Sequence, residues 1–201
     1  RSTLFPYTTL FRSTNRAWKT EILTSGSIAP NAVIEVSFVI DESTSMLFND
    51  PEKIRVDVTK KFIDTLRNGD KVAIIGFSDN STTYQTLTSD FNAVKESLNN
   101  IANNKGGTNL SEGFKKAFEQ YPVAGQDSDQ KENAMKIIVL LTDGQGAYDA
   151  KYEQMAIERG VKIYTVGLGT GYDAGLLVKI ALHTGGKHYS ATRLVDRKSV
   201  V

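Results

Sequence analysis

Four short apolar runs, each rich in β-branched residues, most constrain the fold of this chain of 201 residues. Runs of this length, bounded by turn residues, are typical of strands buried on both faces, as in a parallel sheet. Amphipathic segments with helix-capping residues separate them. The alternation predicts a three-layer, doubly wound (Rossmann-like) α/β fold, with a mostly parallel sheet and helices on both faces. The runs are Val36–Ile40, Val72–Phe77, Ile137–Leu141 and Ile163–Leu168.

Five helices are expected between and after these runs. In the first, Asp50 is expected to be the N-cap and Pro51 the first helical residue, and Asn68-Gly69 should end the helix. Asp90 should cap the second helix, the third should follow Thr108, and Asp149 should open the fourth. The fifth is marked by Leu176, Leu177 and Ile180 at helical spacing.

Two further segments are predicted to be short strands. Thr82–Leu87 alternates polar and apolar residues soon after the second apolar run, which predicts an antiparallel strand at one edge of the sheet. Lys187–Ser190 is predicted to be a last short strand.

Both ends of the chain resemble translated sequencing adapter. Thr3–Ser13 reads TLFPYTTLFRS, and Asp196–Val201 resembles the reverse complement of the same adapter. We therefore expect residues 1–13 and 196–201 to carry no function, residues 14–31 to be a linker or the end of an upstream domain, and residues 32–195 to form one domain. A parent protein that continues in both directions is expected, so the lack of a signal peptide or membrane span does not indicate a cytoplasmic location.

Composition excludes several classes of function. The two ends contribute a net charge of +3 to the overall +1, so the rest of the chain carries about −2 and its charge gives no sign of nucleic-acid binding. The chain has no cysteine, which excludes disulfide bonds, thiolate zinc sites and cysteine nucleophiles.

A carboxylate and two hydroxyls stand at alternate positions directly after the first apolar run, at Asp41, Ser43 and Ser45. In open α/β sheets, ligand crevices form outside the carboxyl ends of the strands. Oxygen atoms are the ligands that a hard cation such as Mg²⁺ prefers. Alone this D-x-S-x-S motif is a weak signal, because serine at the start of a helix is also an ordinary cap.

Two other segments strengthen the metal hypothesis. Gly106-Gly107-Thr108 delivers a hydroxyl just before a helix, and Asp143 follows another buried strand. Right-handed crossovers bring the ends of all parallel strands to one edge of the sheet. Three loops can therefore place oxygen ligands over one crevice.

These three segments resemble the metal-ion-dependent adhesion site of the von Willebrand factor type A (VWA) domain, and the whole of the chain between its ends resembles that family, most closely its bacterial members. Ile163–Gly169 also resembles the penultimate strand of the family. The resemblance implies that Ser43, Ser45 and Thr108 bind Mg²⁺ directly, whereas Asp41 and Asp143 act through bound water. Mn²⁺ and Ca²⁺ are alternative cations. Thr44 departs from the family pattern, in which glycine is common at this position.

The resemblance implies a divalent-cation-dependent protein-binding or adhesion module and not an enzyme. Neutral hydroxyl ligands leave most of the cation's charge unneutralised, so an Asp or Glu of a protein partner can replace a bound water. No nucleic-acid partner and no direct membrane insertion are expected. The expected location is extracellular or at the cell surface, with the cytoplasm as the alternative.

Three other functions stay open at this point. One is an intracellular docking subunit of an ATP-driven, chelatase-like complex, and another is a structural domain whose metal has become dispensable. The third is a Mg²⁺-dependent phosphatase with Asp41 as nucleophile, but the second aspartate of such a D-x-D motif is here Ser43. No P-loop is present, and neither His183 nor His188 has a serine–carboxylate pattern around it.

Overall fold

The computed structural model describes residues 33–122, 134–169 and 171–191. The predicted adapter-like segments 1–13 and 196–201 and the predicted linker 14–31 lie outside these ranges, and so do residues 192–195 of the predicted domain.

The described part of the chain contains a six-stranded sheet in the order β3-β2-β1-β4-β5-β6, which confirms the predicted fold class. All neighbouring strands are parallel except β3, which is antiparallel to β2 and lies at the edge of the sheet, as predicted. β1 lies between β2 and β4, and all eight of its residues are buried. The strands are β1 (Ile34–Asp41), β2 (Lys71–Phe77), β3 (Ser81–Thr88), β4 (Met135–Thr142), β5 (Val161–Leu168) and β6 (His188–Ala191).

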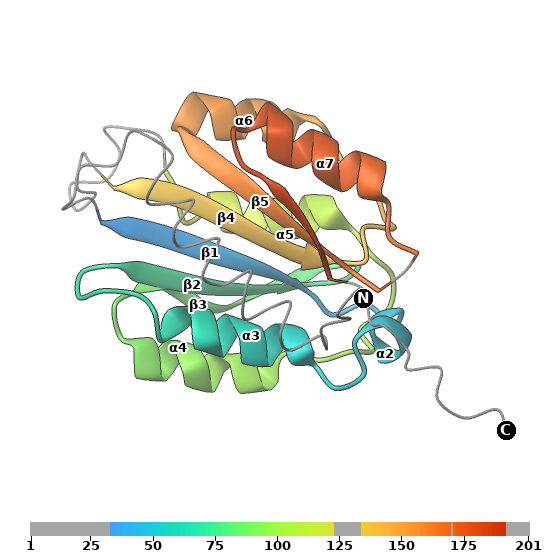
Figure 1. Ribbon diagram of the computed structural model, residues 1–201, viewed down its shortest axis with the longest axis horizontal. Helices are drawn as coiled ribbons and strands as arrows, with labels where there is room; N and C mark the ends of the chain where they lie inside the picture. Colours follow the sequence, from blue (N-terminus) through green and yellow to red (C-terminus); the bar gives the residue numbers. More distant parts are fainter. Residues whose placement is uncertain (1–32, 123–133, 170, 192–201) are drawn as a thin grey trace, which may run out of the picture.

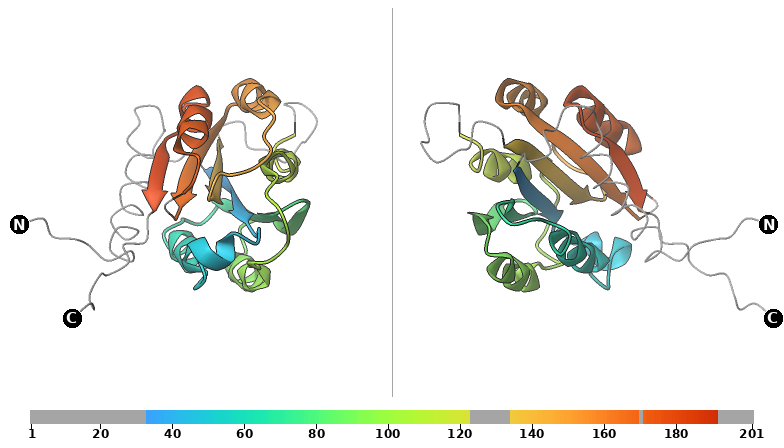
Figure 2. Two further views of the ribbon diagram at one scale, coloured as in Figure 1. Left: turned by 90° about the vertical axis from the view of Figure 1, so that its right-hand side faces the viewer. Right: turned by 60° about the vertical axis from the view of Figure 1, so that its left-hand side comes forward.

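Helices cover both faces of this sheet, so the fold has three layers (Figures 1 and 2). Phe38 and Val39 of β1 point to opposite faces, since side chains alternate along a strand, and each belongs to a separate hydrophobic core. The Phe38 core includes residues of α2 (Met46–Asn49), α3 (Ile54–Ile63), α4 (Phe91–Ser97) and the 3₁₀ turn η1 (Leu98–Asn100). The Val39 core includes residues of α5 (Leu110–Phe118), α6 (Lys151–Arg159) and α7 (Ala174–His183).

The predicted boundaries of the first long helix are wrong at both ends. α3 begins at Ile54, and Lys53 occupies the N-cap position in a left-handed conformation with φ of 52°. Asp50 still caps the helix, but from further away, because its two carboxylate oxygens accept hydrogen bonds from the backbone N–H groups of Ile54 (2.8 Å) and Arg55 (3.1 Å). The helix ends at Ile63, well before Asn68-Gly69.

The other helices begin close to where the sequence predicts. Asp90 caps α4 by accepting hydrogen bonds from two backbone N–H groups of its first turn. α5 follows Thr108 with Asn109 as its N-cap, and α6 starts two residues after Asp149. The single turn α2 was not predicted, because four residues are too few to show helical periodicity.

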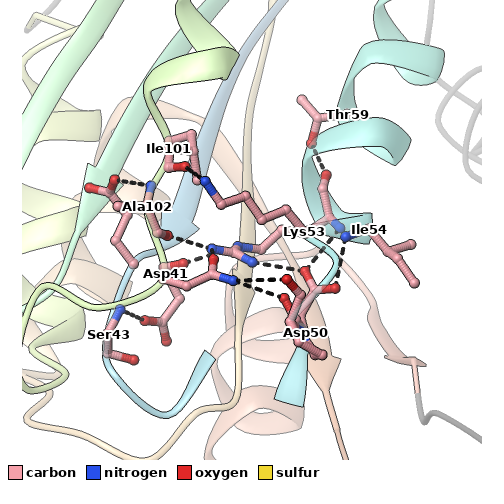
Figure 3. Close-up of polar contacts among 12 residues, drawn as sticks. Asp41, Ser43, Asp50, Lys53, Ile54, Thr59, Ile101 and Ala102 are labelled. Carbon is pink, nitrogen blue, oxygen red and sulfur yellow. Dashed lines mark hydrogen bonds and ion pairs between the residues drawn. The ribbon is translucent and has the colours of Figure 1, made fainter. Parts of the chain in front are cut away.

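A buried arginine joins the carboxyl end of β1 to its surroundings. Arg55 has no exposed surface. Its Nε donates to the Asp41 carbonyl (3.0 Å), and its Nη1 donates to the Asp50 carboxylate (2.8 Å). Its Nη2 donates to the Ala102 carbonyl (2.8 Å) and to the side-chain oxygen of Asn103 (2.6 Å). Figure 3 shows Asp41, Asp50 and Ala102 around these contacts. One side chain thus holds the end of β1, the start of α3 and the segment after η1.

We expect the substitution Arg55→Met to lower the free energy of unfolding by about 3–5 kcal/mol, because it leaves the buried Asp50 carboxylate without its cation. Urea unfolding followed by circular dichroism measures this change. Lys116→Met is the matched control: Lys116 forms an exposed pair with Glu119 (2.8 Å), and its loss should change stability by less than about 1 kcal/mol. A loss below about 1 kcal/mol for Arg55→Met would contradict a structural role for the buried pair.

Candidate metal site

Three segments meet at the carboxyl end of the parallel strands. β1 leads into residues 42–45, β4 leads into residues 143–144, and the loop 105–108 precedes α5. In Figure 1 the arrowheads of β1, β4 and β5 point to the same end of the sheet, where α2 also lies. Ile40 pairs with Leu141 in the sheet, so the ends of β1 and β4 are level with each other.

Two carboxylates, Asp41 and Asp143, are buried at these strand ends. The two oxygens of Asp41 accept hydrogen bonds from the backbone N–H of Ser43 (2.8 Å) and from the Thr142 hydroxyl (2.5 Å). Asp143 Oδ2 accepts a hydrogen bond from the side-chain amide of Asn49 (3.0 Å). Asp143 Oδ1 is buried and has no hydrogen-bond partner among the described residues. An unpartnered buried oxygen of this kind requires an explanation, such as a bound ion or water.

The electrostatics of this pair favour a cation. Burial raises the pKa of the Asp41 carboxyl, and the negative charge of Asp143 adds to the rise, whereas hydrogen bonds from Ser43 and Thr142 oppose it. Among the described residues, neither carboxylate forms a salt bridge. Two buried like charges without a positive partner are unfavourable, and a divalent cation would remove that cost.

Three hydroxyls complete the predicted set. The Ser43 and Ser45 hydroxyl oxygens lie 3.0 Å apart, with Ser43 buried and Ser45 half-buried. The position of Thr108 is fixed through its backbone, because its carbonyl accepts a hydrogen bond from Ala147 N (3.1 Å). Gly146 permits this contact, since a Cβ there would lie 2.2 Å from the Thr108 carbonyl oxygen. The segment after β4 therefore holds the loop that carries Thr108.

The glycine loop before Thr108 is also held from the other side. Thr44 and Gly106 form two hydrogen bonds: Thr44 N donates to the Gly106 carbonyl (2.9 Å), and Gly106 N donates to the Thr44 hydroxyl (3.2 Å). Gly107 N donates to the Asp79 carboxylate (2.9 Å). Thr44, the residue that departs from the family pattern, thus adds a side-chain contact that a glycine could not make.

Glu42, the second residue of the D-x-S-x-S segment, has a structural role that the sequence analysis missed. It is buried, and its Oε1 accepts hydrogen bonds from the Tyr84 hydroxyl (2.9 Å) and Ala102 N (2.8 Å). Lys105 Nζ forms a salt bridge with the same oxygen (3.0 Å), and Lys105 N donates to the Glu42 carbonyl (2.9 Å). No local pattern marks this residue, because its partners lie 42 to 63 positions away in the sequence.

All five predicted site residues lie on the three segments that meet at this edge. The structure brings Asp41, Ser43 and Ser45 into direct contact and sets Asp143 near enough to raise the pKa of Asp41. Asn49 and Thr142 were missed. Thr142 directly precedes Asp143 and could have been found as a hydroxyl at a strand end, whereas nothing in the sequence marks Asn49.

The donor set suits a hard cation. Among the described residues, no group of three or more His, Cys, Asp or Glu side chains could hold a metal, and the predicted set instead combines two carboxylates with three hydroxyls. Oxygen-only donors are typical of Mg²⁺, Ca²⁺ and Mn²⁺ sites. A cation or its bound water would also give Asp143 Oδ1 the partner that it lacks. The residues present therefore fit a divalent metal.

The two histidines pair elsewhere. His183 Nδ1 contacts the Glu153 carboxylate (2.6 Å), and His188 Nδ1 contacts the Thr165 hydroxyl (2.9 Å). Burial lowers the pKa of His188. Neither contact involves a residue of the candidate site. Within the described ranges, no helix has the length and apolar character needed to span a membrane.

Comparison with known proteins identifies relatives in sequence and in structure. The chain is 29% identical over 163 residues to bovine inter-alpha-trypsin inhibitor heavy chain H4, covering 75% of this chain but only 18% of that protein. Its fold is similar to that of the conserved hypothetical protein BatB from Bacteroides thetaiotaomicron, with a TM-score of 0.69, 22% identity, and coverage of 80% of this chain and 91% of that one.

A second similar fold is proximal thread matrix protein 1 from the mussel byssus, in a structure with a zinc-occupied metal-ion-dependent adhesion site. The TM-score is 0.66 at 22% identity, with coverage of 83% of this chain and 43% of that one. The family model of the von Willebrand factor type A domain matches residues 35–198, which is most of the chain. The chain therefore belongs to the von Willebrand factor type A domain family.

Proposed function

We propose that this domain is a divalent-cation-dependent protein-binding module, in which an Asp or Glu of a protein partner completes the coordination of a bound Mg²⁺. The observation that carries the proposal is the pair of buried carboxylates, Asp41 and Asp143, which form no salt bridge among the described residues. Asp143 Oδ1, buried and without a hydrogen-bond partner there, supports it.

In the proposed site, Ser43, Ser45 and Thr108 bind the cation directly, and the two aspartates act through bound water. The contacts of Asp41 support this division, because both of its oxygens already accept protein hydrogen bonds. The close pair of Ser43 and Ser45 hydroxyls supports a shared ligand for these two residues. Mn²⁺ and Ca²⁺ are the alternative cations, and the zinc bound by the mussel protein supports a divalent ion in a site of this kind.

The proposed role is recognition and not catalysis. Hydroxyl ligands are neutral, so the cation would keep most of its charge for a partner's carboxylate. Both histidines make their contacts away from the site, and Lys105, the lysine of the loop before Thr108, is paired with the Glu42 carboxylate.

The identity of the partner, a bacterial source and an extracellular or cell-surface location stay predictions. The chain spans only 18% of the length of the curated relatives that it matches, so their properties as whole proteins are not carried over to it.

The metal claim predicts that Mg²⁺ and Mn²⁺ bind to the wild-type domain with one-to-one stoichiometry in isothermal titration calorimetry. Asp143→Asn and Ser45→Ala should each weaken this binding at least about tenfold, because each removes a charge or ligand from the site. Asp64→Asn is the matched control, since Asp64 is an exposed carboxylate that pairs with Lys95 beyond the end of α3. Equally weak binding by the wild type and by both site variants would overturn the proposal.

A stability prediction follows from the cost of burying two carboxylates. Without metal, Asp143→Asn should raise the free energy of unfolding by about 1–2 kcal/mol, because it removes one of two buried like charges. The introduced amide would keep an oxygen that can accept the hydrogen bond from Asn49. With Mg²⁺ at about one hundred times the wild-type dissociation constant, the wild type should gain about 2.7 kcal/mol and a variant that binds about tenfold more weakly about 1.4 kcal/mol, so the lead of Asp143→Asn should shrink by about 1.3 kcal/mol.

Urea unfolding in EDTA and in Mg²⁺ measures both effects, and Asp64→Asn should show neither the gain in EDTA nor a loss of the response to Mg²⁺. If Asp143→Asn is less stable than the wild type in EDTA, the aspartate has a structural role and the charge argument is wrong.

The contacts of Thr44 predict that its hydroxyl helps to hold the Thr108 loop. Thr44→Val keeps the shape of the side chain but removes the acceptor for Gly106 N, so the Gly106 amide should exchange with solvent faster. Mg²⁺ binding should weaken about twofold to tenfold, the range expected for one hydrogen bond. Thr44→Ser should restore both properties. NMR measures the exchange of the Gly106 amide, and calorimetry measures Mg²⁺ binding. An unchanged exchange rate at Gly106 in Thr44→Val would contradict the prediction.

A further inference from the structure

We propose that the partner recognised at the metal site also contacts an apolar patch formed by Leu47 and Phe48 of α2, so that its acidic residue is flanked by an apolar side chain. This inference rests on the proposed function, and it specifies the chemistry of the partner.

The patch is apolar and open to solvent. Phe48 is 81% exposed and Leu47 is 45% exposed. Single exposed apolar side chains are common on protein surfaces and need no explanation. Here, however, two large ones are consecutive, and they follow Ser45, the last hydroxyl of the motif, by two and three residues. The other large exposed apolar side chains among the described residues are Ile157 and Leu182, on the opposite face of the sheet.

The patch has a fixed position relative to the site. Met46, between Ser45 and the patch, is fully buried in the core and anchors the turn. The backbone N–H groups of Phe48 and Asn49 both donate to the Ser45 carbonyl (3.0 and 3.1 Å). Asn49 then donates through its side chain to Asp143. Figure 1 shows α2 beside the end of the sheet where β1 and β4 stop. Patch and site are therefore joined by one short, hydrogen-bonded turn.

The charge of the proposed cation and the position of the apolar patch beside it indicate which kind of partner fits. A cation held mainly by neutral hydroxyls attracts a carboxylate, whereas Leu47 and Phe48 offer no charge and no hydrogen-bonding side-chain atom. A partner bound at the metal would lie next to α2, because Ser45 is the residue that precedes this helix, and burying apolar surface on the patch would strengthen binding. The occupant that satisfies both is a protein segment with Asp or Glu next to Leu, Phe or a similar residue. A purely acidic segment would leave Phe48 exposed.

A series of small carboxylates tests this inference without a known partner. In NMR titrations with Mg²⁺ present, acetate reports on the metal alone, while 3-phenylpropanoate and 5-phenylpentanoate add an apolar group at two distances. We expect at least one aromatic carboxylate to bind the wild type about fivefold to tenfold more tightly than acetate, because part of its ring is buried on Phe48. Phe48→Ser should abolish this advantage. Ile157→Ser, the matched control at an exposed apolar residue of α6, should retain it.

The outcomes separate this inference from the proposed function. If acetate binds only in the presence of Mg²⁺ but the aromatic carboxylates bind no better, the metal site stands and the apolar patch is wrong. The inference would also be overturned if the aromatic carboxylates still bound Phe48→Ser more tightly than acetate does. NMR chemical-shift changes at Ile157 and Leu182, in place of Leu47 and Phe48, would overturn it as well. If no carboxylate binding depends on Mg²⁺, the proposed function fails and this inference fails with it.

Self-association provides one further test. A second copy of the chain on the patch would appear as concentration-dependent dimerisation that Phe48→Ser abolishes, and that result would replace the acidic partner as the occupant. Sedimentation of the wild type as a monomer at NMR concentrations is the result expected.

Discussion

The geometry of the candidate site depends on one buried guanidinium. Arg55 holds the carbonyl of Asp41 through its Nε, while its remaining hydrogen bonds go to Asp50, Ala102 and Asn103. A buried charge is tolerated when its hydrogen bonds are made, and here those bonds join three segments that are distant in sequence. Because the main chain of Asp41 is held in this way, its side chain is left to turn toward Ser43 and Thr142. The main chain and the side chain of Asp41 thus have separate partners, and the carboxylate lies among residues of the candidate site.

Burying two carboxylates in the candidate site has an electrostatic cost. Asp41 and Asp143 are both buried; burial raises the pKa of the Asp41 carboxyl, and the nearby charge of Asp143 adds to the rise. A chain selected only for stability would place an amide or an apolar residue at one of these positions. A bound cation or partner would offset this electrostatic cost. For that reason, buried carboxylates with a perturbed pKa indicate a functional site.

The sequence was sufficient for most of the fold and for assigning the candidate residues to one edge of the sheet, but not for the contacts that support them. The strands and the antiparallel edge were predictable because β-branched runs and polar alternation are local signals. Asp41, Thr108 and Asp143 could be assigned to one edge because parallel topology dictates where strands end. The start of α3 was predicted wrongly, since Asp50 caps the helix over a longer distance than the usual N-cap. Glu42, Asn49 and Arg55 could not be recognised, because their partners are set by tertiary packing.

These supporting contacts bear on what the metal would do. The loop that carries Thr108 is already held by backbone and side-chain hydrogen bonds with Thr44, Asp79 and Ala147. In small metal-dependent domains the ligand loops lack such contacts, and binding of the ion is what folds them. Here two hydrophobic cores and a six-stranded sheet also support the loops. A cation in this site would act mainly to offset the charge of Asp41 and Asp143, and its remaining coordination would be available to a carboxylate from outside.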